Sequence, residues 1–177
     1  MKQLDELLTE RLLLECLRAA HAADLSRLHR DERAMATLGG VRPPAETRRV
    51  LAECERHWEQ YGFGLWAVRE RATGAFVGRG GLQHTHVGDR DEVEVAYAFL
   101  PQYWGQGLAT ELAAVSVRVG FEVLRLSDLV CFTLTTNHAS QRVMEKAGFR
   151  YERDVLHAGL PHVLYRLTAR AWRAQEI

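Results

Sequence analysis

Residues 92–110 combine a strand-like run, a short glycine loop and the start of a helix. The run Glu92–Leu100 (EVEVAYAFL) has the composition of a strand, and an apolar pattern with helical spacing begins just after Gly105 and Gly107. Glycine lacks a Cβ and tolerates unusual backbone angles, so successive N–H groups in such a loop can converge on an anion. A helix N-terminus adds about half a positive charge at the same place. The stretch therefore predicts an anion-binding loop between a strand and a helix.

A bare Gly-x-Gly loop is not specific, because it also suits a tight strand-to-helix turn that binds nothing. The Walker pattern is absent, so the loop does not resemble a nucleoside triphosphate site of the P-loop kind. Thr110 stands where a dinucleotide-binding loop has its third glycine, and the loop lies in the second half of the chain. A nucleotide or dinucleotide site is therefore disfavoured.

Composition narrows the class of protein. The chain has 177 residues, enough for one domain with a full core, and we expect a single domain over 1–177. Its 23 Lys and Arg balance 23 Asp and Glu, which argues against broad electrostatic binding of nucleic acid. The three cysteines share no C-x-x-C spacing, so we expect reduced thiols, no structural zinc and a cytoplasmic protein. Nothing resembles a signal peptide or a membrane-spanning run.

Periodicity and turn residues predict an α+β domain with helices flanking a mixed central sheet of about six to seven strands. A polar loop is expected over 83–91, and a closing hairpin is expected around Gly159–Pro161. The expected strands are 9–17, 65–70, 75–82, 92–100, 129–135, 150–157 and 162–168, and the expected helices are 19–36, 45–60, 107–124 and 137–147.

Two sequence blocks, about 30 residues apart, resemble the GNAT acetyltransferase superfamily, and most closely its RimJ/RimL-like N-acetyltransferases. The central superfamily signature, [RQ]-x-x-G-x-[GA], is met by Gln102, Gly105 and Gly107. The second block of that branch, N-x-x-S-x-x-V-M-E-K-A-G-F, runs from Asn137 to Phe149. The expected order of elements also matches the fold of this family, so the resemblance covers nearly the whole chain.

The resemblance implies a fold whose sheet splays in the middle and an activity that transfers an acetyl group from acetyl-CoA to a primary amine. No metal is implied, and the protein is expected to be a monomer or a homodimer with no nucleic-acid or membrane partner. In this family the pantetheine arm bonds main chain near Phe99 and Leu100, and Asn137 also contacts the arm. The alternative interpretation of Asn137 is a plain helix N-cap, and the two roles can coexist. The pyrophosphate of CoA lies on the loop and first helical turn, at Gln102, Trp104, Gly105, Gln106, Gly107, Leu108, Ala109 and Thr110.

The reaction needs a base for the attacking amine, donors for the oxyanion and an acid for the departing thiolate. Glu94 is the first choice for the base because it shares a strand face with the small Ala96 and Ala98. A plain solvated or ion-paired strand residue is an equally open interpretation. His157 is the rival base, and it is also compatible with a surface histidine beside a hairpin turn. Ser140 is placed near the thiol in this branch; it also suits a first-turn serine bonded to backbone.

Two features leave the reaction's partners open. Ala96 stands where the branch has glycine, which puts the choice of acyl group in doubt. No signature in the first half identifies the acceptor, which is a protein N-terminus, an antibiotic or a small metabolite. We expect direct attack in a ternary complex, without Cys131 as a nucleophile. A non-catalytic acyl-CoA sensor on the same scaffold is the alternative function.

Overall fold

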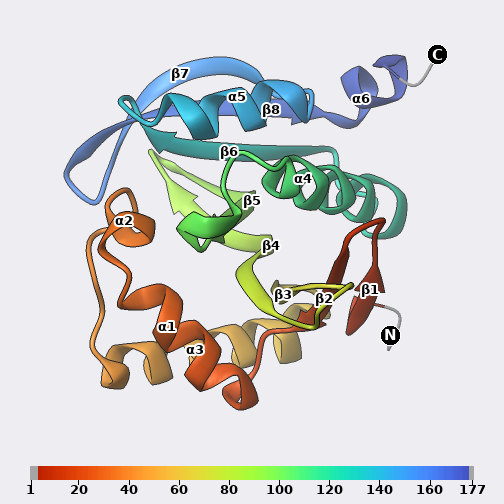
Figure 1. Ribbon diagram of the computed structural model, residues 1–177. Helices are drawn as coiled ribbons and strands as arrows, with labels where there is room; N and C mark the ends of the chain where they lie inside the picture. The colour runs from red at the N-terminus through yellow and green to blue at the C-terminus, as the bar shows by residue number, and fades with distance from the viewer. Residues whose placement is uncertain (1–3, 176–177) are drawn as a thin grey trace. The chain divides into compact units, whose positions relative to one another are not determined.

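The computed structural model describes residues 4–175, and the chain divides into two compact units (Figure 1). The first unit comprises Met1–Gly81 and Tyr97–Leu112, and the second comprises Leu82–Ala96 and Ala113–Ile177. Three elements, a helix and two strands, run from one unit into the other.

The expected α+β class with a mixed sheet is confirmed. The strands are hydrogen-bonded in the order β1-β2-β3-β4-β5-β6-β8-β7, and the pair β5–β6 is parallel. The strands are β1 (Glu6–Leu8), β2 (Leu12–Cys16), β3 (Leu65–Glu70), β4 (Phe76–Val87), β5 (Arg90–Phe99), β6 (Asp128–Leu134), β7 (Arg150–His157) and β8 (Leu160–Thr168). The helices are α1 (Ala22–His29), α2 (Glu32–Met35), α3 (Pro44–Tyr61), α4 (Leu108–Arg118), α5 (His138–Lys146) and α6 (Ala169–Gln175). Two short 3-10 helices are η2 (Ala19–His21) and η3 (Pro101–Tyr103), and the π-helical segment η4 (Val119–Val123) continues α4.

In the first unit, β1 to β3 and the first half of β4 form an antiparallel ladder. Its core contains fully buried side chains of β2, β3 and the helices, such as Leu14, Trp66 and Leu51. Helix α1 lies across α3, and Gly62 ends α3 in the left-handed conformation with φ of 72° (Figure 1).

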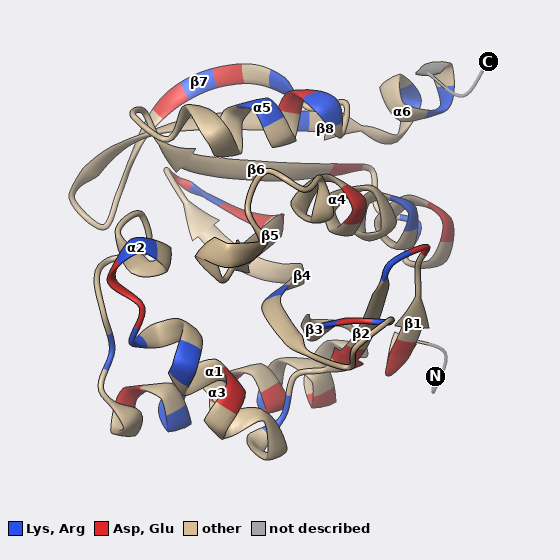
Figure 2. Cartoon of the chain, in the orientation of Figure 1, with Lys and Arg blue, Asp and Glu red and all other residues tan. Residues whose placement is uncertain are grey.

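The second unit is built on β6, which pairs with β8 along its whole length, while β7 pairs with the other edge of β8. Val87 of β4 forms a buried cluster with Val130, Val155 and Leu164 of these strands. Basic and acidic residues are interspersed along β7 (Figure 2). An arginine of β8 joins three other strands. The guanidinium of Arg166 donates to carboxylates on β5, β6 and β7, at Glu92, Asp128 and Glu152.

Four expectations about local structure are wrong in detail. The lead-in before residue 9 forms β1, which pairs with β2 and brings the strand count above the expected number. The helix expected over 19–36 breaks at Arg30, because Asp31 accepts the backbone N–H of Ala34 and caps a new helix. The polar segment expected as a loop belongs largely to β4 and β5. The final hairpin turns at Ala158 and Gly159, both with positive φ, rather than at Gly159–Pro161.

Candidate active site

The glycine loop has the backbone that an anion cradle requires. Gly105 and Gly107 have φ of 73° and 80°, values that favour glycine. The residues from Trp104 to Gly107 are exposed. A Cβ built on Gly105 meets no described atom within 4 Å, so the space beside Gly105 is open. These features fit the predicted diphosphate site.

The first turn of α4 supplies further donors. The N–H of Glu111 donates to the carbonyl of Gly107 at 3.0 Å, which is the first hydrogen bond of the helix. The N–H groups of Leu108, Ala109 and Thr110 precede that bond and have no acceptor within the helix. They are the donors expected from the sequence, at the positive end of the helix.

An arginine that sequence reasoning missed lies against this loop. Arg11, in the β1–β2 turn, donates from Nη1 to the carbonyl of Gln106 at 2.8 Å and from Nε to Glu111 Oε2 at 2.7 Å. Thr9 Oγ1 and the backbone N–H of Arg11 donate to the other oxygen of Glu111, at 2.6 and 2.8 Å. No local signal identifies this contact, because the partners are about 100 residues apart in the chain.

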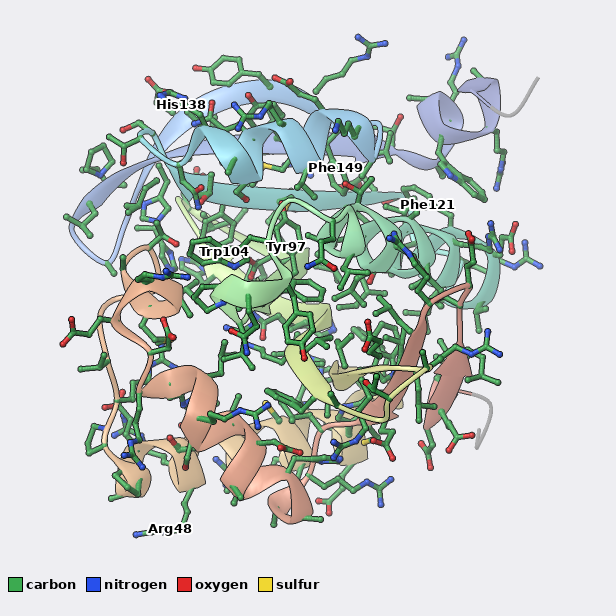
Figure 3. The ribbon with its side chains drawn as sticks, viewed as in Figure 1. Arg48, Tyr97, Trp104, Phe121, His138 and Phe149 are labelled. Atoms are coloured by element: carbon green, nitrogen blue, oxygen red, sulfur yellow. The ribbon has the colours of Figure 1, made fainter. Side chains whose placement is uncertain are left out.

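Hydrogen bonds within the protein hold the end of β5, just before the loop. Trp104 donates its indole N–H to the carbonyl of Phe99 at 2.8 Å, and its ring lies 5.6 Å from the Arg33 guanidinium (Figure 3). Leu100 donates to the Val77 carbonyl at 2.9 Å and accepts from Tyr103. Phe99 and Leu100 are buried, so their side chains hold the loop to the core of the first unit.

In the second unit, Glu94 is buried rather than solvated, with 8% of its surface exposed. Its Oε2 accepts a hydrogen bond from the side-chain amide of Gln83 on β4 at 3.0 Å. Glu94 also pairs with Val130 of β6, and the neighbouring Ala96 on the same strand is buried. Sequence reasoning missed Gln83 because it placed that residue in a loop.

Asn137 caps α5, as its alternative interpretation proposed. Its Oδ1 accepts the Ser140 backbone N–H at 3.2 Å, and its Nδ2 donates to Thr133 Oγ1 at 2.9 Å. These bonds use one of the two N–H groups of the amide and one lone pair of its oxygen. Ser140 is half-buried in the first turn of α5, directly bonded to this cap.

His157 ends β7 and lies in a small ring cluster with Phe132 of β6 and His162 of β8. Its ring is 4.8 Å from the Phe132 ring and 5.4 Å from the His162 ring, centroid to centroid. Burial, and to a smaller extent the nearby His162, lowers the pKa of His157 below the ordinary histidine value. His157 is therefore a neutral imidazole near pH 7, the form that accepts a proton.

Three of the expected site residues of the second unit are neighbours of β6. Glu94 pairs with Val130, the His157 ring lies edge-on to Phe132, and Asn137 is bonded to Thr133 and through its oxygen to Ser140. Phe132 and Thr133 are consecutive, so His157 and Asn137 contact opposite faces of the strand. His86 pairs with Asp91 at 2.8 Å in the β4–β5 hairpin. Within 4–175, no cluster of three or more His, Cys, Asp or Glu side chains could hold a metal ion. No helix among these residues is long and apolar enough to cross a membrane.

Comparison with known proteins gives the family. A model of the acetyltransferase (GNAT) domain matches residues 11–150. The uncharacterized protein YkkB of Bacillus subtilis is 28% identical over 90% of this chain and 94% of its own. FsC-acetyl coenzyme A-N(2)-transacetylase of Aspergillus fumigatus is 31% identical over 81% of this chain and 64% of its own. A solved GNAT-family acetyltransferase from Bordetella pertussis has the same fold, with a TM-score of 0.81 at 24% identity, covering 91% of this chain and 98% of its own. The chain therefore belongs to the GNAT family, the acetyl-CoA-dependent N-acetyltransferases.

Proposed function

We propose that this enzyme transfers the acetyl group of acetyl-CoA to a primary amine by direct attack in a ternary complex. The observation that carries the proposal is the loop at the start of α4, with left-handed Gly105 and Gly107 followed by the first N–H groups of the helix, which have no acceptor within it. We further propose that residues 1–177 form one domain of the RimJ/RimL-like branch, on the strength of the sequence block from Asn137 to Phe149.

The first-unit residues would hold the donor. The N–H groups from Gly105 to Thr110 suit the two phosphates of a diphosphate, because anions bind where backbone donors and the helix dipole coincide. Main chain near Phe99 and Leu100 would meet the pantetheine arm. The Phe99 carbonyl already accepts Trp104 but has a second lone pair for a further donor.

In the reaction, the amine nitrogen bonds to the thioester carbonyl carbon and the carbon–sulfur bond breaks. The amine must lose a proton, and the thiolate must gain one. Glu94 is proposed as the base that takes the amine proton. Burial excludes the solvated interpretation of this residue, and the Gln83 amide fixes the orientation of its carboxylate. Ser140 is proposed to donate a proton to the departing thiolate.

His157 is the second proposed base. Its lowered pKa keeps it neutral at pH 7, so it is able to accept a proton there. The two bases predict different pH profiles of kcat/KM. Activity that depends on His157 falls as the pH drops through its lowered pKa, and this acid limb disappears in His157→Gln. If Glu94 is the base, the acid limb of kcat/KM remains in His157→Gln.

The acceptor is proposed to be an amine of either class, a protein N-terminus or a small molecule. The fungal relative is named as a transacetylase that uses acetyl coenzyme A, which supports the reaction type but not this chain's acceptor.

The test is thiol release from acetyl-CoA with panels of small amines and of peptides with free N-termini. Amine-dependent release, together with a mass increase of one acetyl group on the acceptor, is the expected result. Tight CoA binding without release across both panels would instead indicate an acyl-CoA sensor. Acetyl label retained on the denatured protein after acetyl-CoA alone would contradict direct attack and implicate a nucleophile such as Cys131.

A further inference from the structure

The strongest unassigned feature of the first unit is the contact between Arg11 and the glycine loop. Arg11 bonds the Gln106 carbonyl at 2.8 Å, and its Nη2 lies 3.5 Å from a Cβ built on Gly107. The guanidinium therefore lies directly against the Gln106–Gly107 peptide, within the loop proposed to hold the diphosphate.

The planar geometry of the Gln106–Gly107 peptide means that the contact with Arg11 also sets the direction of the Gly107 N–H. In a trans peptide the C=O and the following N–H lie in one plane and point in opposite directions. The Gln106 carbonyl points at Arg11, so the Gly107 N–H points away from it. Gly107 has no Cβ to resist rotation of this peptide, and glycine populates both signs of φ. The bond to Arg11 is thus what selects one orientation.

The opposite orientation would be harmful to anion binding. A flipped peptide would turn the Gln106 carbonyl oxygen, which carries a partial negative charge, toward the place of the phosphates. It would also remove one N–H donor from the cradle.

Glu111 fixes Arg11 in this role. Its carboxylate lies in the first turn of α4, where an unpaired negative charge would repel phosphate. Burial raises the pKa of Glu111, but hydrogen bonds from Thr9 and from the backbone and side chain of Arg11 outweigh burial and lower it. The carboxylate is therefore ionised, paired with Arg11 and only 15% exposed. Because the pair is internally neutral, Arg11 acts through its hydrogen bond rather than by adding net positive charge.

The turn that carries Arg11 is itself anchored. Arg71 donates to the carbonyls of Thr9 and Glu10, and its backbone N–H donates to the Arg11 carbonyl at 2.8 Å. The backbone that carries Arg11 is thus fixed, and a side chain that orients another group needs such rigid support.

We propose that Arg11 is a positioning residue that holds the Gln106–Gly107 peptide with its N–H toward the diphosphate of the acetyl donor. This inference rests on the proposed function, because it assigns a role within the same donor site. It predicts a contribution to binding of the diphosphate part of CoA and none to binding of the pantetheine part.

The experiment measures dissociation constants of CoA and of pantetheine by calorimetry, for wild type, Arg11→Gln and the control Arg18→Gln. The control removes an arginine from another exposed ion pair of the same unit, with Asp5. Arg11→Gln is expected to weaken CoA about tenfold, the effect of losing one hydrogen bond to a charged group, and to leave pantetheine unchanged. Steady-state kinetics should show a raised KM for acetyl-CoA with little change in kcat. Arg18→Gln should match wild type.

Arg11→Lys serves if Arg11→Gln does not fold, since lysine keeps the charge but lacks the fork that reaches both Glu111 and Gln106. It too should lose CoA affinity selectively. A folded variant in which the CoA-to-pantetheine affinity ratio is unchanged, including one that loses affinity for both ligands equally, would overturn the role of Arg11 but not the proposed function. Failure of wild type to bind CoA would overturn the proposed function and this inference with it.

Discussion

His29 should make the stability of this protein depend on pH between neutrality and pH 4. It is the last residue of α1, with 1% of its surface exposed, and its Nδ1 lies 2.9 Å from Oγ1 of the fully buried Thr47 in α3. Burial, and then the positive charges of Arg42 and Arg79, lower the pKa of His29 from 6.5 to about 4.

The sign of the effect follows from linkage between protonation and folding. The unfolded chain binds the proton at pH 6.5 and the folded chain only near pH 4, so acid favours the unfolded state. The stability is fully present above pH 6.5 and is lost as the pH falls toward 4. Lowering the pKa of His29 from 6.5 to about 4 corresponds to about 3 kcal/mol of stability in full, of which about 2 kcal/mol is lost between pH 7 and pH 5.

Urea unfolding at pH 7 and pH 5, followed by tryptophan fluorescence, measures this loss. His29→Asn replaces the imidazole by a neutral amide that reaches the same Thr47 hydroxyl, so the pH-dependent part of the loss should shrink by about 2 kcal/mol. Other titrating groups cancel when the two pH differences are compared. His138→Asn, at an exposed position at the start of α5, is the control (Figure 3). If His29→Asn loses as much stability as wild type between the two pH values, the buried neutral histidine is refuted.

Three further predictions concern the site. Gly107→Val should raise the KM for acetyl-CoA strongly and cost about 1–2 kcal/mol in stability, because a branched side chain is strained at φ of 80°. Gly74→Val, at φ of 71° in the β3–β4 turn, is the control for backbone strain. Equal KM values for acetyl-CoA in the two variants would contradict the anion cradle. Glu94→Gln should lower kcat, with partial recovery at high pH where solvent deprotonates the amine. If Glu94→Gln leaves kcat unchanged and His157→Gln lowers it strongly, the base is His157. Asn137→Ala should reduce the free energy of unfolding by about 1 kcal/mol through loss of the α5 cap, whereas Asn137→Asp should retain it; equal denaturation midpoints for both variants would show that the cap contributes nothing.

Local patterns in the sequence were sufficient for the class of fold, for most elements and for the glycine loop. The strand before the loop, the left-handed glycines and the helix after it depend on neighbouring residues, so periodicity and turn chemistry predict them. The Asn137 cap was also predictable, because an N-cap acts on N–H groups within three residues of it. Local reasoning failed at the break in the helix over 19–36, where the capping by Asp31 outweighed a continuous apolar pattern.

Tertiary structure alone decided which side chains surround these elements. The bond from Gln83 to Glu94 exists because β4 continues beyond its expected end, and the contact of Arg11 with Gln106 and Glu111 joins segments about 100 residues apart. Contacts of this kind leave no periodic signal in the chain, since each depends on strand register and packing rather than on spacing. The sequence alone determined where a glycine loop would join a strand to a helix and what family it resembled. The folded chain determined which arginine orients that loop and which amide holds the proposed base.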